Sequence, residues 1–245
     1  SIKNVLVVAK KSVYEIYFVK RLADGAARPS RPSARLMKAF RASHDAHYST
    51  LVTVQRALDS LKVRYCTIDR KREITGGLYD LVITVGGDGT FLSAAAQAEH
   101  EWMLGVNSNP LVSVGRFCTA TRKDFEPVLR SILEGRAPIR EMHRMDLWLN
   151  GTFTGIRALN DLLICHVSPP AMSHYRIAVG RRSEVQHSSG GWVATASGST
   201  GAIQSAGGKP MPLGSRSFEY RPRELYVKHG RAYRLKGGVL PPGAP

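Results

Sequence analysis

Cysteine is scarce in this sequence: its 245 residues include only Cys66, Cys118 and Cys165, far apart along the chain. An odd number of widely spaced cysteines argues against a disulfide framework, and against a zinc site, which takes closely paired ligands. We therefore expect buried thiols in a reducing compartment. His44 and His47 could share a metal ion on one helix, but no second ligand pair follows, so a solvated or capping role is the stronger expectation.

Long apolar runs are also missing. No stretch approaches the ~20 apolar residues of a membrane-spanning helix, and residues 1–9 lack the charged start and cleavage site of a secretory signal. The hydrophobic content of 43% is ordinary for a globular protein. We expect a cytoplasmic protein with no membrane partner. Because the chain starts at Ser1 without Met, an organelle after removal of a targeting peptide is the alternative.

Acidic residues are few, with 19 Asp and Glu against 35 Lys and Arg, which gives a formal charge of +16. Such a charge attracts anionic partners. Nucleic acid is one candidate, but no basic cluster interleaved with aromatic residues and no nucleic-acid-binding motif is present. We therefore expect no nucleic-acid partner, and substrates that carry several phosphates fit the charge equally well.

The most informative stretch is an apolar run that ends in a glycine-rich turn. Residues 81–85 are uncharged and rich in β-branched side chains, which is typical of a strand buried in a parallel sheet. Residues 91–98 favour a helix, with Thr90 or Ser93 near its start. Glycines let the backbone approach a ligand closely, and the free amides of a helix start favour phosphate. The turn between strand and helix consists of Gly86, Gly87, Asp88, Gly89 and Thr90.

Asp88 is the unusual residue of this turn. A carboxylate in a phosphate cradle repels its ligand unless it binds a bridging Mg²⁺ or accepts a proton from an attacking hydroxyl, and both roles belong to phosphoryl transfer. The plainer alternative is an ordinary strand-to-helix turn in which Asp88 caps the helix.

The order of patterns predicts two domains. Expected strands at 4–9, 63–68 and 102–107 alternate with expected helices at 34–61 and 124–135, which favours a doubly wound α/β domain over residues 1–139. Lys10 and Lys11 follow the first strand, where they either neutralise phosphate or form a solvated pair. Beyond Pro138 helical periodicity fades, and alternation around Asn150-Gly151 predicts a hairpin. We expect an all-β, sandwich-like domain over residues 140–245.

Two polar stretches stand out in the second domain. Asn160 and Asp161 precede an apolar run, either as ligand-binding groups or as a turn before a strand. Residues 190–208 are dense in glycine and hydroxyls, which let a ligand lie against the backbone and donate to its oxygens. A Gly/Ser-rich linker is the alternative there, although Trp192, Val193 and Ile203 argue for order.

These motifs resemble those of the NAD kinase family. Gly-Gly-Asp-Gly-Thr at 86–90 is similar to its first signature, Asn160-Asp161 to its Asn-Glu or Asn-Asp pair, and 195–200 with 205–208 to its second glycine-rich signature. The residues of these motifs are closer to those of the divergent plant-type NADH kinases than to those of the common bacterial enzymes. Related lipid kinases share the first signature, but the chain lacks their Gly-Thr-x-Asn-Asp element after Asn107.

The resemblance implies a kinase that transfers a phosphoryl group from ATP, with Mg²⁺, to the adenosine-ribose 2′-hydroxyl of NAD or NADH, in a homodimer or higher homo-oligomer. Asp88 would be the general base or orient the hydroxyl, beside a phosphate-binding turn of Gly86, Gly87, Gly89 and Thr90. Asn160 and Asp161 would hold a ribose and the nicotinamide side. No side chain is assigned to the metal. The nucleotide pocket would be lined by Thr195, Ser197, Gly198, Ser199 and Thr200.

The sequence also departs from the family pattern. The usual aromatic adenine contact is missing, with Phe117 as a weak substitute, and family members usually continue well beyond the counterpart of Arg221-Pro222-Arg223. We therefore expect part of the β-rich domain to be absent. The alternatives to an NAD(H) kinase are a lipid kinase of the diacylglycerol or sphingosine type and a non-catalytic dinucleotide sensor.

Overall fold

The computed structural model describes residues 2–20, 32–168, 170–227 and 232–243. The chain forms two compact units, Ser1–Pro138 and Ile139–Pro245, and each is described by itself. Residues 23–33 are rich in Gly, Pro, Arg and Ser, a composition that predicts a loop, and most of them fall on residues 21–31, outside the described residues.

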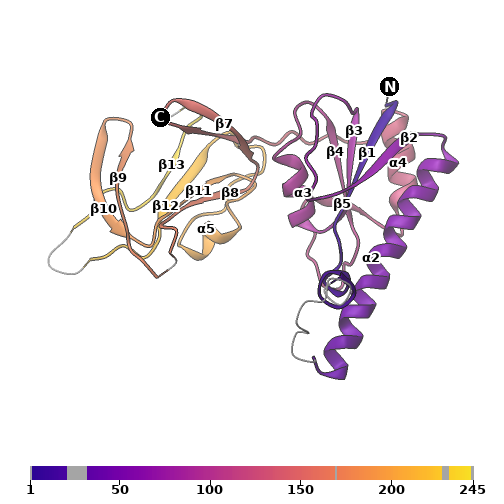
Figure 1. Ribbon diagram of the computed structural model, residues 1–245. Coiled ribbons are helices and arrows are strands. Elements are labelled where there is room, and N and C mark those ends of the chain that lie inside the picture. The colour runs from indigo at the N-terminus through magenta and orange to yellow at the C-terminus, as the bar shows by residue number, and fades with distance from the viewer. Residues whose placement is uncertain (1, 21–31, 169, 228–231, 244–245) are drawn as a thin grey trace. The chain divides into compact units, whose positions relative to one another are not determined.

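The first unit is built on a five-stranded sheet with the order β2-β1-β3-β4-β5 (Figure 1). All four strand pairs are parallel. The central strand, β3, is buried along its whole length, as its uncharged, β-branched sequence predicts. The strands are β1 (Asn4–Ala9), β2 (Arg64–Asp69), β3 (Leu81–Gly86), β4 (Trp102–Asn107) and β5 (Cys118–Thr121).

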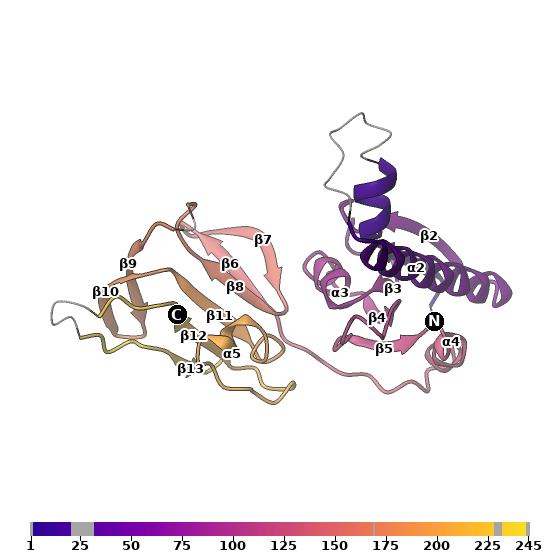
Figure 2. The same ribbon diagram turned by 90° about the horizontal axis from the view of Figure 1, so that it is seen from below.

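Helices cover both faces of this sheet, which confirms the predicted doubly wound α/β fold (Figure 2). On one face, α2 (Ala34–Ser60) contributes Leu58 and α4 (Phe125–Leu133) contributes Leu129 to the larger apolar core. On the other face, α3 (Asp88–Ala95) packs Ala94 against side chains of β1 and β3. The carboxyl ends of the strands are thus left for the loops, where ligands bind in such sheets.

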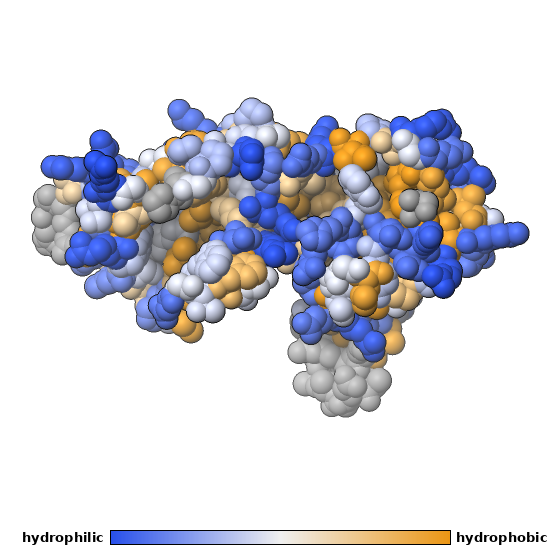
Figure 3. Space-filling view, turned by 90° about the horizontal axis from the view of Figure 1, so that it is seen from above, coloured by the Kyte–Doolittle hydropathy of each residue, from blue (hydrophilic) through white to orange (hydrophobic). Residues whose placement is uncertain are grey.

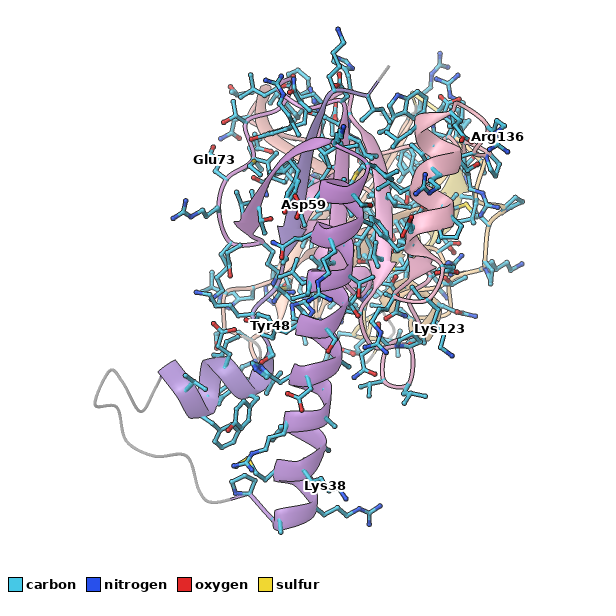
Figure 4. All side chains as sticks on the ribbon, turned by 90° about the vertical axis from the view of Figure 1, so that its right-hand side faces the viewer. Lys38, Tyr48, Asp59, Glu73, Lys123 and Arg136 are labelled. Carbon is cyan, nitrogen blue, oxygen red and sulfur yellow. The ribbon has the colours of Figure 1, made fainter. Side chains whose placement is uncertain are left out.

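The long helix α2 covers the sheet only with its second half. Its buried residues all fall between His47 and Leu58, and Figure 4 shows Asp59 beside the strands and Lys38 beyond them. The other half packs on the preceding segment, a short π-helix η1 (Glu15–Lys20). There Phe18 of η1 packs on Phe40 of α2, with 5.7 Å between ring centroids. Near the middle of α2, Tyr48 donates a hydrogen bond to Glu15 of η1.

The second unit is antiparallel, as the loss of helical periodicity predicts. A four-stranded sheet has the order β13-β12-β11-β8, and two hairpins form separate two-stranded sheets. Asn150 and Gly151, with φ of 50° and 76°, make the predicted turn of the first hairpin. The short helix is α5 (Ala202–Ser205). The strands are β6 (Met145–Leu149), β7 (Thr152–Ala158), β8 (Asp161–Ile164), β9 (Ser173–Val179), β10 (Arg182–Ser188), β11 (Gly191–Thr195), β12 (Phe218–Pro222) and β13 (Gly238–Leu240).

The cysteines correct one expectation. All three are free, but Cys66 and Cys165 are exposed rather than buried, because one lies on the edge strand β2 and the other follows the edge strand β8. Burial raises the pKa of Cys118 to about 11, so this thiol stays protonated.

Hydrophilic residues cover much of the face in Figure 3, with apolar residues gathered in patches among them. Among the described helices, none has the length and apolar character needed to cross a membrane.

Candidate functional site

The glycine-rich turn after β3 is shorter than expected. The strand ends at Gly86, Gly87 is the N-cap residue with an extended backbone, and α3 begins at Asp88, not near Thr90 or Ser93 as its apolar run suggests. The amides of Thr90 and Phe91 both donate to the Gly87 carbonyl. The amides of Asp88 and Gly89 therefore remain as the free donors of the helix start, where an anion is favoured.

The three glycines of the turn serve different ends. A Cβ at Gly86 would lie 2.3 Å from the Thr90 hydroxyl oxygen, and a Cβ at Gly87 would lie 2.4 Å from the Ser113 hydroxyl oxygen. These two glycines therefore allow close packing. At Gly89 the nearest atom is Nη1 of Arg70, 3.9 Å from such a Cβ. Gly89 is exposed, so it leaves the backbone open to a ligand.

Asp88 holds a neighbouring loop, and no side chain caps α3. Its Oδ1 accepts a hydrogen bond from the backbone amide of Phe117, 2.8 Å away. The carboxylate is half-buried, and among the described residues no hydrogen bond reaches Oδ2. Asp88 thus presents one oriented oxygen and one available oxygen, which suits a group that accepts a proton or binds a cation.

The sequence indicates Phe117 only as a weak substitute for the aromatic adenine contact. The Phe117 ring is buried and stacks on Phe91 with 5.5 Å between centroids. That position leaves little of the ring for an adenine contact. Its backbone amide, which orients Asp88, carries no signal in the sequence.

His47 links the strand ends on either side of β3. Its Nε2 donates to the carbonyl of Lys10, at 2.7 Å, and its Nδ1 pairs with the Ser108 hydroxyl, at 3.0 Å. With 1% of its surface exposed, His47 is neither solvated nor a cap, because the face of α2 that carries it packs against the sheet. His44 instead bonds Ser12 and lines a groove of about 580 Å³ along α2. No group of three potential metal ligands occurs among the described residues.

Burial of His47 predicts acid sensitivity. Burial lowers its pKa to about 4, against ~6.5 in an unfolded chain. As the pH falls from 6.5 toward 4, the unfolded state binds a proton that the folded state does not, so folding loses up to about 3 kcal/mol. Urea unfolding of wild type and His47→Gln should show a steeper pH dependence for wild type between pH 5 and 6.5. Equal slopes would contradict this role.

In the second unit, Asn160 and Asp161 stand at the start of β8. The Asn160 amide donates to Asp161 Oδ1 at 3.0 Å, while Asp161 Oδ2 is buried without a partner. Burial raises the pKa of Asp161, while hydrogen bonds from the Ala202 amide and the Asn160 side chain lower it by less. The unpartnered Oδ2 of Asp161 is therefore available to a hydroxyl donor.

The loop after β11 folds onto this pair. The Thr195 hydroxyl donates to the Leu159 carbonyl at 2.5 Å, and the Thr195 amide to the Asn160 carbonyl at 3.0 Å. A Cβ at Gly198 would lie 2.1 Å from the Asn160 carbonyl oxygen, and one at Gly201 would lie 3.1 Å from Asp161 Oδ2. The Asn160-Asp161 pair and the loop at 195–201 are therefore in direct contact.

The hydroxyls of this loop divide into two groups. Ser199 Oγ donates to the Ala196 carbonyl and accepts from the Met211 amide, so it holds the loop in shape. Ser197 Oγ is buried and has no partner. Thr200 is half-buried, with no hydrogen bond to a described residue.

Unsatisfied polar atoms gather at the predicted residues. Buried polar atoms are nearly always hydrogen-bonded, yet four side-chain oxygens of the described residues are buried and unpartnered. Three of them belong to residues singled out from the sequence, and the fourth, in β3, carries no sequence signal. They are Thr90 Oγ1, Asp161 Oδ2, Ser197 Oγ and Thr84 Oγ1.

The sequence is similar to those of proteins named NADH kinase or NAD kinase. No family model matches the chain. It is 34% identical over 202 residues to a protein of Oryza sativa subsp. japonica named "Probable NADH kinase", covering 73% of this chain and 62% of that protein. It is 38% identical over 168 residues to the NADH kinase of Arabidopsis thaliana, covering 59% and 53%. The NAD kinase of Aquifex aeolicus is 32% identical over 175 residues, with 66% and 61% covered.

Solved structures agree on the fold. The NAD kinase from Archaeoglobus fulgidus in complex with ATP has a TM-score of 0.62 at 20% identity, covering 97% of this chain and 77% of that one. Yeast NADH kinase complexed with NADH has a TM-score of 0.64 at 16% identity, covering 98% and 66%. The chain spans less than two thirds of the curated relatives named above. Over the part of these proteins that it spans, the chain belongs to the NAD kinase family.

Proposed function

We propose that the chain transfers a phosphoryl group from ATP to the adenosine-ribose 2′-hydroxyl of NAD or NADH. The observation that carries this proposal is the Asp88 carboxylate at the start of α3, oriented by the Phe117 amide and with Oδ2 available. Relatives named NADH kinase and NAD kinase support the choice of substrates.

Asp88 has the chemistry that the transfer needs. The 2′-oxygen attacks the γ-phosphorus, the bond to the ADP oxygen breaks, and the proton of the hydroxyl passes to Asp88. The free amides of Asp88 and Gly89 lie at the amino end of α3, where the helix dipole stabilises negative charge. In phosphoryl transfer the reacting groups need mainly positioning and charge stabilisation, which this turn supplies.

We propose Mg²⁺ as the metal that accompanies ATP. Mg²⁺ keeps several waters and is usually held through substrate phosphates with few protein ligands, so it would enter with ATP, and we assign no side chain of this chain to it. When bound, the ion would neutralise charge on the phosphates.

From the resemblance to the NAD kinase family we also propose a homo-oligomer. Light scattering of the purified chain would measure its oligomeric state.

The second unit supplies groups for the dinucleotide. Asp161 Oδ2 and Ser197 Oγ are buried and lack partners, so hydroxyl and amide groups of NAD(H) would satisfy them. An unmet acceptor and an unmet hydroxyl cost stability in the free protein, and a ligand that bonds them recovers that cost.

Replacement of Asp161 should separate binding from stability. Asp161→Asn should weaken NADH binding about 10- to 100-fold, since a charged hydrogen bond contributes about 1.5–3 kcal/mol. The free energy of unfolding should stay equal or rise, because burial disfavours the ionised form. Calorimetric titration and urea unfolding measure both, with Asp146→Asn on β6 as the control carboxylate. Unchanged NADH affinity would argue against this role.

A substrate matrix tests the function itself. NADP(H) formation is measured with Mg²⁺ for each combination of NAD or NADH with ATP or polyphosphate. Diacylglycerol and sphingosine are tested in parallel. Product from a dinucleotide supports the proposal. Phosphorylated lipid, or nucleotide binding without any product, would favour the lipid kinase or the sensor instead.

A further inference from the structure

Two basic residues stand side by side at the carboxyl edge of the sheet. Lys10 follows β1 and Arg70 follows β2, and these parallel strands pair with Ala9 opposite Asp69. The Arg70 amide donates to the Ala9 carbonyl at 2.8 Å, and the Lys10 carbonyl accepts from His47 at 2.7 Å. The backbone of each residue is therefore fixed.

The charges of this pair are not neutralised. Neither side chain forms an ion pair with a described carboxylate, and the neighbouring Asp69 lies 3.9 Å from Nζ of Lys11 instead. Both side chains are half-buried. Burial and the charge of Arg70 lower the pKa of Lys10. Two cations so close together destabilise the free protein slightly and attract an anion.

The pair lies next to the glycine-rich turn. Arg70 Nη1 is the atom nearest to the open face of Gly89, and the Ser93 hydroxyl of α3 donates to the Arg70 carbonyl at 3.5 Å. The Asp88 carboxylate is held by the Phe117 amide, and the buried Thr90 hydroxyl has no partner. Cations, free amides and an unmet hydroxyl therefore occur around one turn.

We propose that Lys10 and Arg70 bind the phosphate chain of the phosphoryl donor beside Gly89. The inference rests on the proposed function. The pyrophosphate of the dinucleotide has the same chemistry, but the donor's triphosphate carries more negative charge and so matches two unneutralised cations better. The sequence shows two lysines after the first strand. Arg70 lies in no motif, and only the register of β1 and β2 places it beside Lys10.

The test measures binding without turnover. Lys10→Gln, Arg70→Gln and the control Lys71→Gln are titrated with inorganic tripolyphosphate and with NADH in the absence of Mg²⁺. Lys71 is exposed and adjacent to Arg70, so its replacement removes the same charge without removing the pair. We expect tripolyphosphate affinity to fall about 10- to 100-fold in the first two variants. NADH affinity should stay within about two-fold, and the control should resemble wild type.

Two results would overturn the inference: unchanged tripolyphosphate affinity in both variants, or an equal loss of NADH affinity. Thermal melts verify that each variant is folded, and Arg70→Lys should recover part of the affinity because it restores the charge without the planar fork. Wild type that binds tripolyphosphate through this pair yet forms no NADP(H) would refute the proposed function and leave the site standing. Normal turnover and an unaltered KM for ATP in both variants would refute the site alone.

Discussion

Asp88→Asn should lower kcat for NADP(H) formation about 10²- to 10⁴-fold, which corresponds to about 3–5 kcal/mol of barrier. The amide cannot accept the proton of the attacking hydroxyl. The side-chain oxygen of the asparagine can still accept the hydrogen bond that the Phe117 amide donates to Asp88 Oδ1 in wild type, at 2.8 Å. The fold and most of the NADH affinity should therefore persist, as steady-state kinetics, titration and thermal melting would show.

A matched control separates chemistry from structure. Asp124, just before α4, also binds a backbone amide, that of Thr121, at 2.6 Å. Asp124→Asn should alter stability slightly while kcat stays near that of wild type. Turnover by Asp88→Asn within a few-fold of wild type would refute the general-base assignment.

Gly198→Ala should disrupt the second unit. A Cβ there would lie 2.1 Å from the carbonyl oxygen of Asn160 and 2.4 Å from its carbon. Both are backbone atoms, so the start of β8 must move. Overpacking costs about 1–3 kcal/mol and more where backbone must shift, and we expect the upper end. Because the same shift displaces Asp161, NADH affinity should fall at least about 10-fold.

The control for this substitution is Gly214→Ala, where a Cβ would have no neighbour within 4 Å. Its free energy of unfolding and NADH affinity should match those of wild type. If Gly198→Ala unfolds at the same urea concentration as wild type and binds NADH equally well, the close contact between the two motifs does not matter for the site.

Elements with a strong local pattern were predictable. The uncharged, β-branched run became the buried strand β3, the helix expected at 34–61 became α2, and Asn150-Gly151 formed the hairpin turn. In each case the pattern itself records burial or a turn conformation. The start of α3 was wrong because Gly87 allows the backbone to turn directly into a helix, which the apolar run beyond it does not reveal.

The candidate site was predictable in residue types but not in contacts. The glycines and hydroxyls of 195–200 indicate a ligand, whereas the fit of Gly198 against Asn160 depends on strand pairing between β8 and β11. His47 gave no indication of its role, because only tertiary packing buries it between two strand ends. Local sequence records periodicity and turn chemistry, and it carries little information on which distant residues meet.

The central claim is transfer of the γ-phosphoryl group to the 2′-hydroxyl, and label transfer tests it most directly. The purified chain is incubated with Mg²⁺, γ-labelled ATP and NAD or NADH, and the labelled product is located by phosphorus NMR. We predict label on the 2′-position of the adenosine ribose, and its loss with Asp88→Asn. Label found only in inorganic phosphate, or on any other position of the dinucleotide, would contradict the account.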